Sequence, residues 1–291
     1  MLSIIICSLD AKLLRQVSKN IAETVDIPYE LLFADNKEAK DGICKVYNRL
    51  AAQAQYPYLC FVHEDVLLHT NCWGRELIEA LAHQYVGLVG VSGATYKSKY
   101  PASWSACNKE LYRFSGIQHF KQTSKSSHSA YNPLNEKLSE VAVIDGVLMA
   151  IKKEVWNRFP FNELELTGFH CYDIDLSIRI KKAGYTILVM QAVRLEHLSE
   201  GNLNENWLKD SLKFHNKEMN FLPLEIGSIN TELKRVSDYQ SLVAVLTILI
   251  DFKGNKVRVV RYYLTLMIKY FSYNRLTFSR QVVKYLMGLA R

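Results

Sequence analysis

The first 200 residues alternate apolar, strand-like runs with helix-like stretches, and this alternation constrains the fold more than any other feature of the sequence. Residues 2–7 form a continuous apolar run typical of a strand buried on both faces, and 12–23 have the three-to-four spacing of a helix. Further strands are expected at 29–34, 58–62 and 86–91, and helices at 45–55 and 73–83. This order predicts an α/β fold with a mainly parallel sheet flanked by helices and joined by right-handed crossovers.

The alternation breaks off and then resumes. Residues 93–139 are rich in Ser, Lys, Tyr and Gly and are too long for a connector, so we expect an irregular excursion or lid there. An apolar run over 141–151, a helix over 173–183 ended by Gly184 and a strand over 186–193 follow. After about residue 205 the chain has a helical pattern. We therefore expect a catalytic-type α/β domain, 1–205, and a helical basic C-terminal region, 206–291.

Composition excludes several classes of protein. With 49% hydrophobic and 11% aromatic residues, the chain does not have the signature of a disordered protein. Its six cysteines include no CxxC pair and its first residues do not resemble a secretory leader, so we expect a reduced, cytoplasmic location. The longest apolar run, 242–250, is much shorter than the roughly 20 residues of a membrane-spanning helix.

Polar side chains follow the expected strands where each strand ends. In an α/β sheet, ligands bind beyond the carboxyl ends of the strands, so these side chains are candidates for one site. Carboxylates together with an imidazole suit Mg²⁺ or Mn²⁺, and such an ion would bridge phosphates. Taken singly, each of these residues is equally well explained as a turn former or a helix cap. The candidates are Ser8, Asp35, Asn36, His63, Glu64, Asp65, Asp145 and His197.

Two carboxylates, Asp173 and Asp175, stand at the start of the helix expected over 173–183. Acidic groups at a helix N-terminus are stabilised by the helix dipole, so simple capping explains them. A carboxylate beside a phosphate-binding metal site would also be placed to accept a proton from an incoming hydroxyl. The sequence leaves both interpretations open, and we expect Arg179 and Lys182 to serve the helix surface.

Seven segments in order resemble the family 2-like glycosyltransferases of the GT-A fold, and more narrowly the branch related to the StrF protein. The resemblance extends over about residues 1–201. It implies a metal-assisted transferase that uses a nucleotide-diphospho-sugar. The segments are SIIICS, ADN at 34–36, YNRLA at 47–51, FVHEDV at 61–66, DGVLMAIKKEVW at 145–156, FHCYDIDLSIRIKKAGY at 169–185 and LEHLSEG at 195–201.

The resemblance also implies a role for each matching residue. His63-Glu64-Asp65 stands where the family has its DxD motif, with His63 replacing the first acid; Asp65, His63 and His197 would hold Mn²⁺ or Mg²⁺. Asp173 matches the base of inverting members, and Tyr172 replaces an acidic residue often found before it. The donor-binding positions would be Ser8, Asp35, Asn36, Glu64, Asp145 and Gly146, the last two lining the sugar pocket.

The C-terminal region carries the excess positive charge. Residues 252–291 include nine Lys or Arg and no Asp or Glu. An apolar face at three-to-four spacing, from Val257 through Leu264 to Phe271, is flanked by cations and accompanied by tyrosines. These features are typical of a helix at an anionic membrane surface, here the inner face, and equally of a helix packed on its own domain. No nucleic-acid reader motif occurs, so nucleic acid is not an expected partner.

These expectations lead to one function and two alternatives. We expect an inverting glycosyltransferase, a hexosyl- or related transferase, that acts on a cell-surface glycan or lipid-linked acceptor, as in polysaccharide biosynthesis. A sugar-phosphate nucleotidyltransferase is the alternative enzyme, but SIIICSLDAKLL has no glycine-rich phosphate loop. A non-catalytic module that binds a nucleotide-sugar or glycan is the alternative without chemistry.

Overall fold

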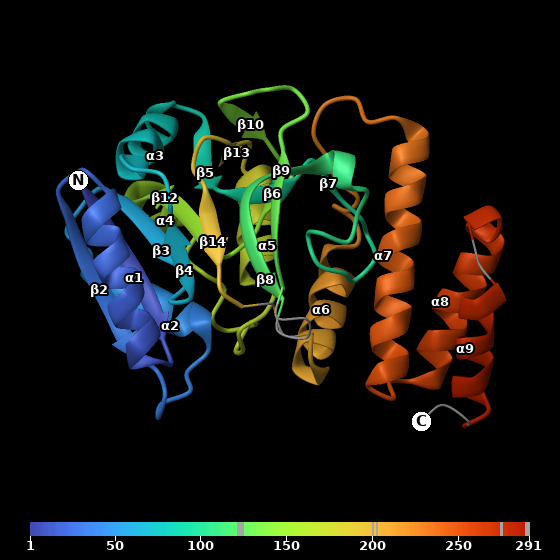
Figure 1. The fold of residues 1–291 in the computed structure, drawn as a ribbon. Coiled ribbons are helices and arrows are strands. Elements are labelled where there is room, and N and C mark those ends of the chain that lie inside the picture. Colours follow the sequence, from blue (N-terminus) through green and yellow to red (C-terminus); the bar gives the residue numbers. More distant parts are fainter. Residues whose placement is uncertain (121–124, 200, 202, 274–275, 289–291) are drawn as a thin grey trace. The chain divides into compact units, whose positions relative to one another are not determined.

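The computed structural model describes residues 1–120, 125–199, 201, 203–273 and 276–288, without the side chains of 120, 125–129 and 276–278. The chain forms two compact units (Figure 1). Met1–Thr95 and Lys109–Gly201 make up the first unit, and Tyr96–Asn108 and Asn202–Arg291 make up the second. A short segment from within the first 205 residues is thus part of the C-terminal unit.

A seven-stranded sheet is the centre of the first unit. Its strand order is β10-β13-β5-β12-β3-β1-β2. β1 runs parallel to both β2 and β3, and β13 runs parallel to β5, whereas β12 and β10 are antiparallel to their neighbours. The α/β fold with helices flanking a central sheet is therefore as predicted, but the sheet is evenly mixed instead of mainly parallel, because β12 and β10 insert antiparallel pairs. The strands are β1 (Leu2–Ser8), β2 (Tyr29–Asp35), β3 (Tyr58–Val62), β5 (Val86–Gly90), β10 (Leu138–Glu140), β12 (Leu148–Lys152) and β13 (Thr186–Met190).

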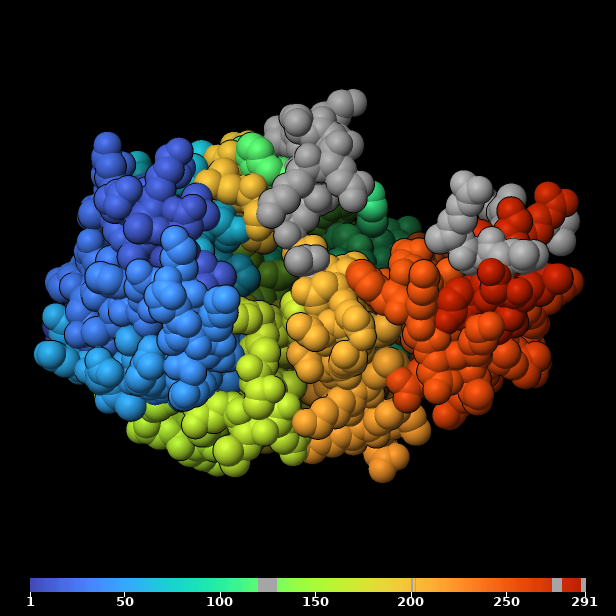
Figure 2. All heavy atoms as spheres, turned by 90° about the horizontal axis from the view of Figure 1, so that it is seen from below, coloured from blue at the N-terminus to red at the C-terminus, as the bar shows by residue number. Residues whose placement is uncertain are grey.

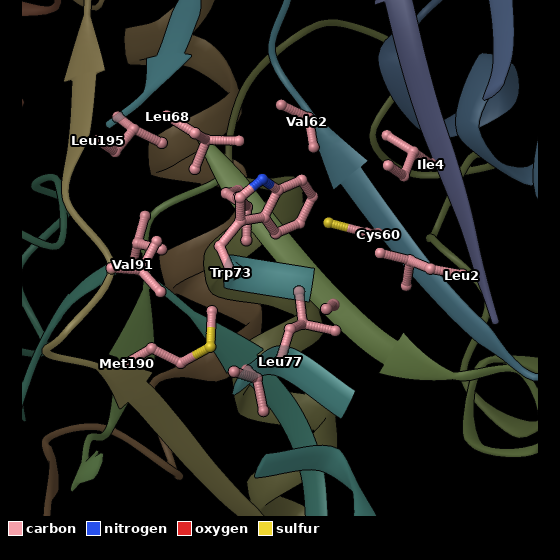
Figure 3. Close-up of a cluster of buried hydrophobic side chains, with 14 of the residues drawn as sticks. Leu2, Ile4, Cys60, Val62, Leu68, Trp73, Leu77, Val91, Met190 and Leu195 are labelled. Atoms are coloured by element: carbon pink, nitrogen blue, oxygen red, sulfur yellow. The ribbon is translucent and has the colours of Figure 1, made fainter. Parts of the chain in front are cut away.

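Helices cover both faces of this sheet because its strands are apolar on both sides. Successive side chains of a strand point to opposite faces, and Ile4 and Ile6 of β1 belong to one buried cluster with α1 and α3. Trp73 is completely buried in this cluster, and its indole N–H donates to Thr24 Oγ1 at 3.0 Å (Figure 3). The helices are α1 (Ala11–Thr24), α2 (Ile43–Gln53), α3 (Trp73–Ala82), α4 (Lys153–Arg158) and α5 (Tyr172–Lys182).

A second sheet forms where we expected an irregular excursion. Its strand order is β11-β6-β8-β14-β4, and β9 pairs with β8. The prediction of an irregular excursion is therefore wrong for β6, β8 and β9, because strands that are short or polar do not show the apolar period that identifies buried strands. The run at 141–151 is two strands, one in each sheet, separated at Asp145–Gly146. The strands are β4 (Val66–Leu68), β6 (Ser92–Ala94), β8 (Tyr112–Phe120), β9 (Lys125–Tyr131), β11 (Val143–Ile144) and β14 (Leu195–His197).

The C-terminal unit is mainly helical and has its own apolar core. Asp238 of α7 fixes the 96–108 segment within this unit, accepting from the Tyr96 hydroxyl at 2.9 Å and the Ser98 hydroxyl at 2.6 Å. Within the described part of the chain, no helix is both long and apolar enough to span a membrane. The elements are β7 (Tyr96–Lys97), α6 (Glu205–Glu218), β15 (Leu224–Glu225), α7 (Thr231–Asp251), α8 (Lys256–Lys269) and α9 (Leu276–Leu286), with 3-10 turns η1 (Lys109–Leu111) in the first unit and η2 (Phe271–Tyr273) in the second.

Candidate functional site

Strand pairing brings together three loops of the first unit that are far apart in sequence. His63 directly follows β3, and its N–H donates to Val147 O at 3.1 Å because β12 runs antiparallel to β3. Asp145 and Gly146 therefore lie beside the end of β3. β14 is antiparallel to β4 and pairs His197 with Val66, next to Asp65. His197 thus lies beside residues that precede it by more than 100 positions in the sequence.

His63, Asp65 and His197 form a cluster with the chemistry of a metal site. Asp65 Oδ1 lies 3.5 Å from His197 Nε2 and 4.0 Å from His63 Nδ1. One ligand atom from each residue lies within 4.8 Å of the other two, and in the described residues this is the one such group of three or more. Carboxylate oxygen and imidazole nitrogen are both ordinary ligands of divalent metal ions. The three side chains therefore fit a divalent cation.

The charge states of Asp65 and His63 suit a cation, whereas His197 would give up a proton to bind one. Burial by itself would raise the pKa of Asp65, but the hydrogen bond and charge of His197, together with His63, hold it well below its ordinary value. Burial and the neighbouring His197 lower the pKa of His63, so at neutral pH its imidazole is uncharged and has a lone pair to offer. Asp65 thus supplies negative charge and His63 a neutral nitrogen. Burial by itself would lower the pKa of His197, but the hydrogen bond and charge of Asp65 raise it, so a bound cation would displace a proton from His197.

Hydrogen bonds fix the orientation of all three side chains. His63 Nε2 lies 2.6 Å from the Tyr172 hydroxyl, and His197 Nδ1 lies 3.2 Å from Gln118 Oε1. Ser199 donates its hydroxyl to Asp65 Oδ2. Because the far nitrogen of each imidazole is engaged, the near nitrogen faces Asp65. Outer partners of this kind orient metal ligands and raise their basicity.

Asp173 lies beside this cluster, in the first turn of α5. Its Oδ2 accepts from the Gly146 N–H at 3.2 Å and its Oδ1 from the Ile174 N–H at 2.8 Å. Burial and the charge of Asp145 raise the pKa of Asp173 to about 7. Capping alone does not explain such a carboxylate, because it is poised to gain and lose a proton near neutral pH.

Gly146 lies close against Tyr172, the first residue of α5. A Cβ built there would lie 2.1 Å from the hydroxyl oxygen of Tyr172, so no larger residue fits unless Tyr172 moves. Asp145 holds this turn by accepting from the Val147 N–H at 2.8 Å. The turn thus lies between the end of β3 and the start of α5, and its role in lining a sugar pocket remains a prediction.

Glu64 and Ser8 are paired with each other. Ser8 donates its hydroxyl to Glu64 Oε2 at 2.6 Å, and the N–H groups of Leu9 and Asp10 also donate to the Glu64 carboxylate, at 3.0 to 3.1 Å. Glu64 therefore ties the loop after β1 to the loop after β3. This pairing gives both residues a clear structural role at the edge where we expect the donor.

Asp35 and Asn36 lie at the same edge, at the end of β2, and the Asn36 N–H donates to Ser8 O at 2.7 Å. Asp35 accepts from the Lys37 N–H at 3.0 Å. The buried Asn36 side chain exchanges two hydrogen bonds with the backbone of Asp41. Both side chains thus help to hold the loop after β2, and donor contact by either residue remains a prediction.

Three residues that support the site had no role in the sequence interpretation. Tyr172 was noted only as a replacement for an acid, and Gln118 falls in the segment expected to be irregular. Ser199 lies in the LEHLSEG segment, two residues beyond His197, the last residue of β14, and this closeness in sequence is the available signal. Asp175, the second acid at the start of α5, forms an ion pair with Arg179 at 2.7 Å within α5.

The chain belongs to a glycosyltransferase-like family, whose sequence model matches residues 3–220. Its fold is that of the GT-A glycosyltransferases. The structure of GalNAc-T7 with UDP, GalNAc and Mn²⁺ is similar at a TM-score of 0.52 and 11% identity, covering 82% of this chain and 54% of that one. This chain thus spans about half of that protein.

A second solved structure is similar over almost the whole chain. The mannosyltransferase PcManGT from Pyrobaculum calidifontis, in complex with GDP-Man and Mn²⁺, gives a TM-score of 0.50 at 13% identity, covering 99% of this chain and 85% of that one. At these identities the similarity concerns the fold. No protein of curated function matches the sequence. The StrF-related branch remains a prediction.

Replacing Tyr172 by phenylalanine tests its hold on His63. We expect Tyr172→Phe to weaken Mn²⁺ binding by about ten- to a hundredfold, because the imidazole loses the partner that orients it. Mn²⁺ binding is measured by electron paramagnetic resonance, and the His63 tautomer by nitrogen chemical shifts.

The matched control is Tyr47→Phe. Tyr47 is fully buried and its ring lies 6.0 Å from that of Tyr172, but its hydroxyl has no hydrogen-bond partner among the described residues. Wild-type Mn²⁺ affinity is expected for this variant. Equal affinities in both variants would show that Tyr172 does not position His63.

Proposed function

We propose that this protein transfers a sugar from a nucleotide-diphospho-sugar to an acceptor hydroxyl, with inversion at the anomeric carbon. The observation that carries the proposal is the placement of the His63–Asp65–His197 cluster beside a carboxylate, Asp173, whose pKa is about 7. The two similar structures named above contain nucleotides or nucleotide sugars together with Mn²⁺, which supports the same kind of donor here.

Each residue has a defined task in this reaction. A divalent cation held by His63, Asp65 and His197 would neutralise charge on the departing diphosphate. Asp173, as carboxylate, accepts the acceptor's hydroxyl proton while the acceptor oxygen bonds to the anomeric carbon. The bond from that carbon to the phosphate oxygen breaks in the same displacement, and the nucleoside diphosphate leaves with the electron pair. One carboxylate suffices for this scheme.

The acceptor we propose is a cell-surface glycan or a lipid-linked glycan, as in polysaccharide biosynthesis. The first unit presents a second sheet, β11-β6-β8-β14-β4, beside the site, and Gln118 of β8 already contacts His197. The contact of Gln118 with His197 supports the proposal that side chains of β8 help to select the acceptor.

The reaction is expected to depend on pH through Asp173. The pKa of about 7 means that the carboxylate is half protonated at that pH, and only the ionised form accepts a proton. Below pH 7, kcat/KM should therefore fall about tenfold for each pH unit, and above it should level off. Initial rates from pH 5 to 9 measure this. A rate independent of pH below 7 would contradict the assignment of Asp173.

A donor panel tests the proposed function. UDP-, GDP- and dTDP-sugars are incubated with the full chain, Mn²⁺ and simple glycoside acceptors, and release of nucleoside diphosphate and the anomeric configuration of the product are measured. One donor is expected to give an inverted glycoside. Binding of a donor without any transfer would instead support a non-catalytic module, and a retained configuration would overturn the inverting scheme.

A further inference from the structure

Helix α8 has apolar side chains on two sides, and only one side is covered by its own unit. Val259 and Leu266 are completely buried and Tyr270 nearly so, all within the core that α7 and α9 share. This face accounts for the packing of the helix. Apolar residues on the other side therefore need a separate explanation.

The other side carries a line of exposed apolar side chains, here called the α8 stripe. Its spacing of three or four residues places the members within α8 on one face, about 16 Å long at 1.5 Å per residue, and Phe271 follows in η2, just beyond the helix end. Monomeric proteins rarely leave a continuous apolar line of this kind open to water. The stripe consists of Val257, Val260, Leu264, Ile268 and Phe271, with exposed fractions of 78%, 38%, 52%, 79% and 68%.

The surroundings of the stripe are strongly basic. Arg261 is exposed within it, and Lys269 is exposed at its edge. Residues 252–291 contain nine Lys or Arg and no acid. Helix α9 adds two more exposed apolar side chains, Val283 at 47% and Met287 at 67%, beside Lys284. Figure 2 shows α8 and α9, in orange to red, at the surface of the C-terminal unit.

We infer that the α8 stripe inserts into the interface of an anionic lipid bilayer, such as the cytoplasmic leaflet of a membrane. An amphipathic helix lying in the plane of the interface buries its apolar residues below the headgroups while its cations meet anionic lipid. The charge argues against a second copy as the occupant, because two such faces would bring two sets of uncompensated cations together. With no described helix able to span a bilayer, attachment is to the surface.

Vesicle co-sedimentation of the full chain tests this inference. Wild type is expected to bind phosphatidylcholine vesicles containing about one third phosphatidylglycerol, more weakly at high salt, and to bind pure phosphatidylcholine poorly. The double variant Leu264→Ser/Ile268→Ser should lose at least about tenfold in affinity for anionic vesicles, because it removes two aliphatic side chains that would be buried in the bilayer.

Two controls separate the stripe from general effects. Leu134→Ser/Leu164→Ser removes two leucines that are 65% and 89% exposed in the first unit, and it should bind like wild type. Reversal of charge at Arg261 and Lys269 to glutamate should weaken binding at least about tenfold, whereas the same reversal at the exposed Arg15 and Lys19 of α1 should not.

Any one of three results would overturn the inference. The first is equal binding of wild type to anionic and neutral vesicles, and the second is binding of the stripe variant as tight as that of wild type. The third is a wild-type dimer, found by sedimentation equilibrium, that the stripe variant dissociates; a second copy of the chain would then be the occupant. Thermal unfolding midpoints confirm that each variant is folded, and no sugar-transfer assay enters the test.

Discussion

Asp65→Asn should lower kcat/KM for sugar transfer by at least about a thousandfold, because cation stabilisation of the departing charge is worth several kcal/mol. Asp65 is the one carboxylate of the metal cluster, lying 3.5 Å from His197 Nε2 and 4.0 Å from His63 Nδ1. Asparagine keeps the volume and can still accept from Ser199, but it removes the negative charge. Mn²⁺ affinity and steady-state rates measure the effect.

The matched control for Asp65 is its neighbour Glu64. The Glu64 carboxylate is occupied by Ser8 and by the backbone N–H groups after β1, so it does not belong to the metal cluster. Glu64→Gln is therefore expected to keep Mn²⁺ affinity within about a factor of three, since its one amide oxygen, in the place of Oε2, can still accept from Ser8 and from the backbone N–H groups. If Asp65→Asn bound Mn²⁺ as tightly as wild type does, Asp65 would not be a ligand of the cation.

Asp173→Asn should reduce kcat by about a hundred- to ten-thousandfold while donor and Mn²⁺ affinities stay near their wild-type values. The amide keeps the size of the side chain and one oxygen for the Gly146 N–H, but it cannot accept the acceptor's proton. Calorimetry measures binding and single-turnover rates measure the chemical step. An equal loss of donor affinity would indicate a binding role instead.

The same substitution should also stabilise the protein above pH 7. The folded-state pKa of Asp173, about 7, exceeds its ordinary value of 3.8, so folding disfavours the ionised form. The resulting loss of stability begins above about pH 4 and is complete above about pH 7. Asp173→Asn removes it, so the variant should unfold at a higher temperature than wild type at pH 8 and similarly at pH 4.

Asp175→Asn provides the comparison within the same helical turn. Asp175 is buried and pairs with Arg179 at 2.7 Å, so its loss leaves Arg179 without that partner. This variant is expected to be less stable than wild type at pH 8, whereas Asp173→Asn is expected to be more stable. The single-turnover rate of Asp175→Asn should stay near that of wild type. A fall in single-turnover rate as large as that of Asp173→Asn would contradict the separate roles.

The parts of the fold that the sequence predicts are those with a long apolar period. β1, β2, β3 and β5 and the helices between them lie within a residue or two of their expected positions, because their apolar residues recur with a clear strand or helix period. The second sheet escaped prediction because its strands are short or polar and are stabilised by pairing with segments far away in sequence, such as β14 with β4 and β8.

The candidate site shows the same division. His63, Asp65, Asp145 and His197 could be selected because each follows a strand, and the sheet brings them together. The role of Tyr172 could not be predicted, because its contact with His63 depends on how closely α5 approaches the turn at Gly146. That distance is set by tertiary packing, which local sequence does not encode.

The central claim is that the His63–Asp65–His197 cluster recruits the donor through a cation. The most direct test is to titrate the wild-type protein with UDP-, GDP- and dTDP-sugars, first in Mn²⁺ and then in EDTA. Isothermal calorimetry is the measurement. We expect one donor to bind in Mn²⁺ and to lose at least about tenfold in affinity in EDTA, since the charge that holds the diphosphate is then missing. Equal binding in EDTA, or no binding of any nucleotide sugar, would contradict the account.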